Sequence, residues 1–301
     1  MPAEDFFRAI DDITPHVDPH HTFIILTGGE PLLRDDLEVC GHELHRRGFP
    51  WGMVSNGLAL TESRLRSLVQ SGMHSITISL DGFEEDHNWL RQNPHSFEQA
   101  SHAIQMLVRQ RRVVWDIVTC INPRNLNRME EFKEWLISIG VRQWRCFTIV
   151  PMGRAAHAPA LQLTDSQFRE VFEFIKRTRE EGRIHVSYGC EGFLGPYELQ
   201  VRDHLFYCRA GVEVASILND GSISGCTSIR SNFHQGNIYN DSLWDVWQNR
   251  FQPYRDRTWT HKGACKDCQM YRHCEGSGMH LYDDNAELRF CHLRRLGIPT
   301  Q

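Results

Sequence analysis

Residues 22–31 read Thr-Phe-Ile-Ile-Leu-Thr-Gly-Gly-Glu-Pro, an apolar, β-branched run that stops at two glycines and a carboxylate. A short apolar run bounded by turn-forming residues is typical of a buried strand in a parallel sheet. Glycines at the carboxyl end of such a strand let a ligand approach the backbone, and the Glu30 carboxylate can bind an ammonium group. Taken alone, a Gly-Gly-Glu run is more often an ordinary turn, so the interpretation depends on the rest of the chain.

The same strand pattern recurs through the first half of the chain. Short β-branched or aromatic runs follow at 51–54, 75–80, 113–119 and 144–150. Segments with helical apolar spacing separate them, with Thr61 as a predicted N-cap and Gly48, Gly72 and Gly140 at predicted helix ends. A further helix is predicted at 164–181. Strands and helices that alternate every ~25–40 residues predict right-handed βαβ crossovers and a parallel sheet or barrel.

Polar residues follow three more of these strands. They are Ser55-Asn56-Gly57, Ser79-Leu80-Asp81-Gly82 and the segment 119–122, which ends in Asn122. Ligands of α/β folds bind at the carboxyl ends of parallel strands, so polar strand ends at one edge favour a bound polar ligand. Asn-Gly and Asp-Gly are also common turn formers, which leaves an ordinary structural role open.

Composition excludes several classes of function. The 301 residues carry 33 Lys and Arg against 38 Asp and Glu, a net charge of −5, which argues against strong nonspecific binding to nucleic acid or anionic lipid. No apolar run approaches the ~20 residues of a membrane span. The first 13 residues are acidic and amphipathic, unlike a signal peptide, so we expect a cytoplasmic protein.

Cysteine is concentrated in the last third of the chain, where helical periodicity fades and glycine becomes frequent. We therefore predict one domain over 1–182 and a second, cysteine-rich domain over 183–301. In a chain without an export signal, such a cluster of cysteines indicates metal or iron–sulfur binding rather than disulfides.

Two groups of cysteines have the spacing of metal ligands. The first is Cys265-x2-Cys268-x5-Cys274 followed by Cys291, which can form a four-sulfur site for zinc or for an iron–sulfur cluster. Spacing alone leaves that choice open.

The second group is Cys208 and Cys226, with Cys190 upstream. A predicted hairpin that turns at Asp220-Gly221 would return Cys226 to the side of Cys208. Three thiolates could hold a second cluster with one iron left open, or with a ligand supplied from elsewhere. A buried structural cysteine is a competing interpretation for Cys190.

Together these segments resemble a radical S-adenosylmethionine (radical SAM) enzyme with a C-terminal SPASM domain. Gly28, Gly29, Glu30 and Pro31 resemble the motif that binds the methionyl amino group, and Pro151–Ala155 resembles the segment that ends the sixth barrel strand. Other strand-end residues match, more loosely, positions that contact the ribose and the carboxylate: Ser55, Asn56, Ser79 and Asn122.

The resemblance also shifts the choice of metal from zinc to [4Fe–4S]. The complete ligand set of the outer auxiliary cluster is matched by Cys265, Cys268, Cys274 and Cys291. The other auxiliary cluster is matched by Cys208, Cys226 and Cys190, but its fourth cysteine would fall at Gly278. We therefore expect one complete auxiliary site and one incomplete one.

The implied fold is α/β: a partial (β/α)6 radical SAM barrel that lacks its first strand and cluster loop, followed by a small SPASM-like domain. Members of this family bind the catalytic cluster through Cys-x3-Cys-x2-Cys upstream of the Gly-Gly-Glu, whereas the 27 residues before Gly28 contain no cysteine. We expect the sequence to be truncated relative to its gene; a variant without the catalytic site is the alternative.

The resemblance implies an oxidoreductase that cleaves S-adenosylmethionine reductively, giving methionine and a 5′-deoxyadenosyl radical that abstracts hydrogen from a peptide or small protein. An electron donor such as a flavodoxin or ferredoxin would supply the electron. No catalytic side chain is assigned. Two other hypotheses remain at this point: a non-catalytic iron–sulfur module for electron transfer or peptide binding, and a zinc-stabilised scaffold.

Overall fold

The computed structural model describes residues 1–229 and 231–300 and divides into two compact units. One, here called the sheet unit, comprises Pro2–Phe147 with Glu181–Val186. The other, the cysteine-rich unit, comprises Thr148–Glu180 and the chain from Ser187 onward. The sequence predicts a single cut between residues 182 and 183, whereas each of these units combines segments that are separate in the chain. The predicted domain boundary therefore stays a prediction.

Six strands form one sheet, in the order in which they occur in the chain. They are β1 (Ile24–Leu26), β2 (Trp51–Ser55), β3 (Met73–Ser79), β4 (Val114–Ile121), β5 (Gln143–Thr148) and β6 (His185–Tyr188). The pairs β1–β2, β2–β3 and β3–β4 are parallel, with Leu26 opposite Met53 and Ser79 opposite Val118. The predicted α/β class and the five predicted strands are confirmed.

The sixth strand was not predicted. Residues 185–188 read His-Val-Ser-Tyr, in which only Val186 and Tyr188 are buried. Four residues with two apolar side chains give a weak periodic signal, and they fall where the chain becomes rich in glycine and cysteine. This strand extends the sheet into the range predicted for the second domain.

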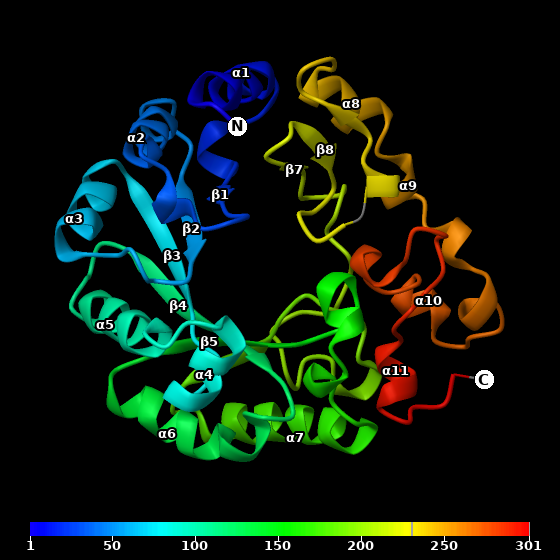
Figure 1. Cartoon of the computed structure of the whole chain (residues 1–301). Coiled ribbons are helices and arrows are strands. Elements are labelled where there is room, and N and C mark those ends of the chain that lie inside the picture. The colour runs from blue at the N-terminus through cyan, green and yellow to red at the C-terminus, as the bar shows by residue number, and fades with distance from the viewer. Residues whose placement is uncertain (230, 301) are drawn as a thin grey trace. The chain divides into compact units, whose positions relative to one another are not determined.

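One helix precedes the first strand of the sheet unit, and the others lie between its strands. They are α1 (Ala3–Ile13), α2 (Leu37–Arg46), α3 (Glu62–Gln70), α4 (Glu84–Arg91), α5 (Ser96–Val108) and α6 (Met129–Ser138). Thr61 caps α3 by accepting a hydrogen bond from the Arg64 N–H, as predicted. Gly48, Gly72 and Gly140 have φ of +87°, +88° and +94°, the left-handed conformation expected after a helix. In Figure 1, α2, α3 and α5 lie along one side of the strands.

A tight contact between helix and sheet fixes the position of α2. The Trp51 ring is fully buried, and its indole N–H donates to the Ser71 carbonyl at 3.2 Å. A Cβ atom on Gly41 would lie 2.2 Å from that ring, so only glycine lets α2 approach β2 this closely. Burial of an aromatic side chain of this kind contributes about 1.5–3 kcal/mol.

Apart from one 17-residue helix over Asp165–Glu181, the cysteine-rich unit is built from short elements. After α7 (Asp165–Glu181) come β7 (Ser216–Ile217), β8 (Ser222–Ser224), β9 (Gly236–Asn237), α8 (Leu243–Asn249), α9 (Gln252–Arg255), α10 (Tyr271–Cys274) and α11 (His292–Arg295). The predicted hairpin is confirmed, because β7 and β8 pair antiparallel and Gly221 turns between them with φ +83°. None of the helices described in either unit has the length and apolar character needed to span a membrane.

Candidate functional site

The Glu30 carboxylate joins the ends of two neighbouring strands. One oxygen accepts hydrogen bonds from the Ser55 hydroxyl at 2.7 Å and from the Leu32 N–H at 3.1 Å. The other accepts from the Asn56 N–H at 2.7 Å. An ionised carboxylate offers about four lone-pair sites, so three donors leave room for one more, such as a ligand ammonium.

The two glycines before Glu30 keep the space beside the backbone open. Gly28 has φ +119°, which favours glycine, and no atom lies within 4 Å of the position of a Cβ on Gly28 or on Gly29. Pro31 is buried and starts a short 3-10 helix over 31–33, for which Glu30 is the N-cap. The structure therefore brings Gly28, Gly29 and Glu30 together with Ser55 and Asn56 at one exposed strand end.

Ser79 and Asn122 lie at the next strand ends. Ser79 is the last residue of β3, one position beyond Ile78, which pairs with Ser55. Asn122 follows β4 and is buried; its amide nitrogen donates to the Cys120 carbonyl at 3.2 Å, and its amide oxygen accepts from the Arg124 N–H at 3.0 Å. These bonds hold the loop after β4 in place. Direct binding of a ligand by Asn122 stays a prediction, as it does for the other residues predicted to contact S-adenosylmethionine.

A buried carboxylate fixes the loops after β3 and β4. Asp81 accepts hydrogen bonds from the Cys120 N–H at 2.8 Å and from Arg91 at 2.7 Å, while Asn125 donates to the Asp81 carbonyl at 2.6 Å. Burial opposes ionisation of Asp81, but the hydrogen bond from His87 and the charge of Arg91 outweigh it and lower its pKa. The sequence showed only an Asp-Gly turn here, because the partners of Asp81 lie up to 44 residues away.

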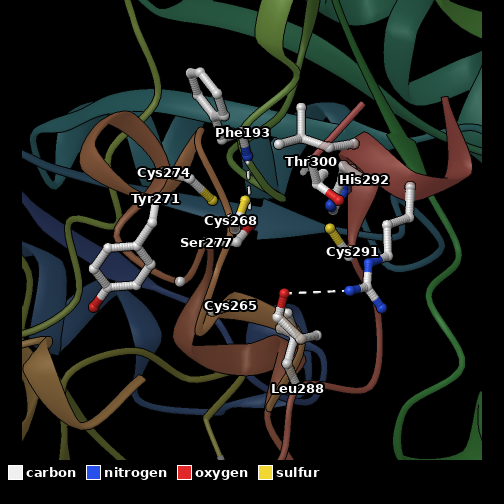
Figure 2. Close-up of a pocket in the computed structure, with 14 residues that line it drawn as sticks. Phe193, Cys265, Cys268, Tyr271, Cys274, Ser277, Leu288, Cys291, His292 and Thr300 are labelled. Carbon is white, nitrogen blue, oxygen red and sulfur yellow. Dashed lines mark hydrogen bonds between the residues drawn. The ribbon is translucent and has the colours of Figure 1, made fainter. Parts of the chain in front are cut away.

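Four cysteines line one pocket of the cysteine-rich unit. Figure 2 shows the sulfur atoms of Cys268, Cys274 and Cys291 turned toward the same space, which Cys265 also lines. Cys274 ends α10, and Cys291 is the N-cap of α11. The sequence spacing thus corresponds to spatial proximity for all four.

The surroundings of these four thiols favour the binding of a cationic metal centre. Burial and the neighbouring thiols of Cys291, Cys265 and Cys268 raise the pKa of Cys274 to about 12, and burial raises those of Cys265 and Cys291. Thiolates this close repel one another unless a cationic centre shares their charge. Among the described residues, no three His, Cys, Asp or Glu side chains are close enough to bind a single metal ion. The donor set surrounds a space and fits a cluster with one thiolate per iron.

The second group of cysteines also gathers in space. Although Cys190 is partly exposed, desolvation of its sulfur and the nearby thiols of Cys226 and Cys208 raise its pKa. Cys226 follows β8, and the Cys208 sulfur accepts from the Met279 N–H at 3.5 Å. Three thiols from distant segments thus lie close enough to interact electrostatically, and that of Cys208 contacts the residue that follows Gly278.

A buried polar network holds the loop of Cys190, and the sequence did not reveal it. Glu191 accepts from the N–H and the hydroxyl of Thr148, both at 2.8 Å, and from the Tyr188 hydroxyl. Arg202, 1% exposed, donates to the Gly192 carbonyl at 2.9 Å. No local pattern indicates these partners, because Glu191 lies in an irregular, glycine-rich segment.

An apolar cluster borders both cysteine groups. Phe193, Phe206 and Leu293 form its buried centre. Several half-buried side chains pack against it, among them Cys208, Cys274 and Cys291. Such packing lowers the access of water to the sulfurs, which tunes a bound iron–sulfur centre.

Comparisons with known proteins agree with this geometry. The Radical SAM superfamily model matches residues 1–136, and the SPASM model, an iron–sulfur cluster-binding domain, matches residues 208–269. An AdoMet-dependent heme synthase of Nitratidesulfovibrio vulgaris is 24% identical, with 95% of this chain and 81% of the relative covered. The mycofactocin maturase MftC of Mycolicibacterium smegmatis is 26% identical, with 92% of this chain and 71% of the relative covered.

A solved structure has the same fold. The structure of anSMEcpe with bound AdoMet and a peptide superimposes with a TM-score of 0.76 at 15% identity, covering 99% of this chain and 87% of that one. With a six-stranded α/β sheet, two cysteine groups and both domain models matched, the chain belongs to the radical SAM enzymes that carry a SPASM domain.

Proposed function

We propose that this protein binds S-adenosylmethionine at the end of β1 and takes part in its reductive cleavage, which modifies a peptide or small protein. The observation that carries the proposal is the Glu30 carboxylate, held by Ser55 and Asn56 with one acceptor site left. In this family, bound S-adenosylmethionine that accepts one electron from a reduced catalytic cluster would yield methionine and a 5′-deoxyadenosyl radical that takes hydrogen from the substrate.

The residues of the chain would bind and orient the methionyl end of the cofactor. Glu30 would accept a hydrogen bond from the ammonium group, and the bare backbone of Gly28 and Gly29 would let that group come close. Because Ser55 and Asn56 already hold the carboxylate, little side-chain entropy would be lost on binding. Ser79 and Asn122 remain proposed contacts for the ribose and carboxylate.

The auxiliary sites would bind iron and sulfide. Cys265, Cys268, Cys274 and Cys291 would hold one [4Fe–4S] cluster, and Cys190, Cys208 and Cys226 would supply three ligands of another. The sequence contains no Cys-x3-Cys-x2-Cys run, so its residues do not fit the catalytic cluster and no step is assigned through it.

The SAM site is tested by the affinity of the protein for S-adenosylmethionine. A charge-assisted hydrogen bond contributes about 1.5–3 kcal/mol, so Glu30→Gln should weaken binding ~10–100-fold by calorimetry. Glu62→Gln, an exposed carboxylate at the start of α3, should leave the affinity unchanged. Equal affinities for wild type and Glu30→Gln would remove the proposed role of Glu30.

The cluster assignment is tested by metal analysis after oxygen-free reconstitution. Iron and sulfide in equal amounts, with the broad visible absorption of thiolate-bound clusters, are expected. Zinc without sulfide would instead support a zinc-stabilised scaffold.

Peptide modification is favoured by the relatives named as maturase and as PqqA peptide cyclase. A second candidate is heme formation, favoured by three relatives named AdoMet-dependent heme synthase that cover 86–95% of this chain. Ligand binding to the reconstituted chain separates the two. Saturable binding of short peptides without binding of heme supports the first, whereas binding of heme without binding of peptides supports the second.

A further inference from the structure

The second group of cysteines has a glycine where the family pattern has its fourth cysteine. Cys190, Cys208 and Cys226 supply three thiols, and Gly278 supplies no side chain. An iron–sulfur cube presents four irons, so one iron would need a ligand from another residue.

The space beside Gly278 is taken by a histidine. A Cβ atom at Gly278 would lie 2.6 Å from Cε1 and 2.9 Å from Nδ1 of His280, distances that real Cβ atoms essentially never show. The Glu191 carbonyl oxygen would lie 3.0 Å from the same position. The imidazole ring therefore occupies the place where a cysteine side chain at 278 would begin, and a cysteine there would require the His280 ring to move.

The turn that carries His280 lies against the Cys208 thiol. Residues 279–281 form a 3-10 helix with Gly278 as N-cap, closed by the Leu281 N–H on the Gly278 carbonyl at 3.0 Å. The first N–H of this turn, that of Met279, donates to the Cys208 sulfur at 3.5 Å. His280 is half-buried and follows directly. The backbone of Glu191, the neighbour of Cys190, also lies beside position 278.

We propose that His280 is the fourth protein ligand of the second auxiliary cluster, where it replaces a cysteine at position 278. This inference rests on the proposed function, because it requires that this site hold an iron–sulfur cluster. A neutral imidazole nitrogen binds iron, and exchange of thiolate for imidazole removes negative charge and raises the reduction potential, as in centres with mixed Cys and His ligands. Arg202, buried and close enough to Cys190 to interact with it electrostatically, acts in the same direction.

Other histidines near the cysteines are less suited to this role. His273 is exposed and stacks on Phe193, which lines the outer pocket, the one that also holds the four cysteines of the first group. His292 follows the outer ligand Cys291 and packs against the Phe168 and Phe290 rings, with centroids 5.6 and 5.0 Å away. Of these three histidines, only His280 has ring atoms within 3 Å of the position that a Cβ atom would take at residue 278.

The test is pulsed EPR of the full chain, reconstituted with iron and sulfide without oxygen and then reduced. Wild-type protein should show a strong nitrogen coupling of the kind produced by a directly bound nitrogen, and its pattern should change when the histidines carry 15N. His280→Ala should lose that coupling and bind less iron, whereas His273→Ala should keep both. No nitrogen coupling in wild type, or a coupling that survives in His280→Ala, would overturn the proposal.

A double variant keeps the test independent of folding defects. Gly278→Cys with His280→Ala removes the ring that would clash and restores a thiolate. It should bind as much iron and sulfide as wild type, lack the nitrogen coupling and have a lower reduction potential. An unchanged potential in that variant would also count against His280. Protein that binds no iron and sulfide would overturn the cluster assignment itself, whereas loaded protein without nitrogen coupling would overturn only the role of His280.

Discussion

The two units of this protein are stabilised in different ways. The sheet unit has strands of up to eight residues and helices of 8–13 residues, with fully buried side chains such as Trp51, Ile78 and Leu107. The cysteine-rich unit has strands of two or three residues, and α9, α10 and α11 have four residues each. Isolated helices of that length are not stable in water, so these segments depend on packing or on a cross-link such as a bound metal centre.

The comparison teaches where the stability of each unit lies. In the sheet unit, the residues of the proposed ligand site are held by hydrogen bonds to one another, such as those on Glu30. The outer cysteine site instead arranges four thiols around a space, and burial keeps these thiols neutral unless a cationic centre binds them as thiolates. We therefore expect the sheet unit to fold without its ligand and the cysteine-rich unit to depend on iron and sulfide.

The largest effect is expected from removing the metal. Structural metal sites contribute on the order of 10 kcal/mol to folding, so chelation should expose the segment from 258 to 300. Hydrogen exchange followed by mass spectrometry should show fast exchange there and unchanged protection in β2, β3 and β4. Equal protection of both units before and after chelation would contradict the comparison.

The next effect concerns the buried carboxylate of the sheet unit. Asp81→Asn removes the charge that pairs with Arg91, whose side chain is 32% exposed, and should lower the free energy of unfolding by about 1.5–3 kcal/mol, with unchanged iron content. Because the pKa of Asp81 is below its usual 3.8 in the folded state, its contribution is complete above pH 3.8 and is lost as the pH falls through the folded value. Denaturant unfolding at neutral and at acidic pH should therefore show a smaller difference between wild type and variant in acid. If the difference in unfolding free energy between wild type and Asp81→Asn did not change with pH, the lost stability would come from packing and not from the charge of Asp81.

A smaller effect is expected at the contact of α2 with Trp51. Alanine is favoured over glycine inside a helix by about 1 kcal/mol, but in Gly41→Ala the new methyl group would lie 2.2 Å from the Trp51 ring. Overpacking costs about 1–3 kcal/mol, so the variant should be less stable than wild type in denaturant. His42→Ala, at the exposed neighbouring position, is the control and should be neutral or slightly stabilising. A more stable Gly41→Ala would mean that α2 can move away from the sheet.

The smallest effect is expected at the N-cap of α3. Thr61→Ala removes the acceptor of the Arg64 N–H and should cost about 1 kcal/mol, whereas Thr61→Ser should retain most of the stability. Both values come from denaturant midpoints of the sheet unit. Loss of bound iron in Thr61→Ala would show that the two units do not unfold independently.

Local patterns of the sequence were sufficient for much of the fold. Five strands, the Thr61 cap, the glycines at three helix ends and the Asp220–Gly221 hairpin all depend on residues within one short segment. Cysteine spacing likewise indicated which thiols line the outer pocket. The strand β6 was not predicted, because the apolar pattern of its four residues is too weak.

What the sequence determined by itself was the class of fold, the order of strands and helices, and the types of residue available at each site, since propensity, turn chemistry and spacing are local properties. Only the tertiary structure decided that Ser55 and Asn56 hold Glu30, that Thr148 and Tyr188 hold Glu191, and that the His280 ring fills the place of a side chain at Gly278. Most of these contacts join residues 25 to 43 positions apart, and even the short step from 278 to 280 depends on which way one turn faces. Packing of distant segments sets such contacts, and no single segment encodes them.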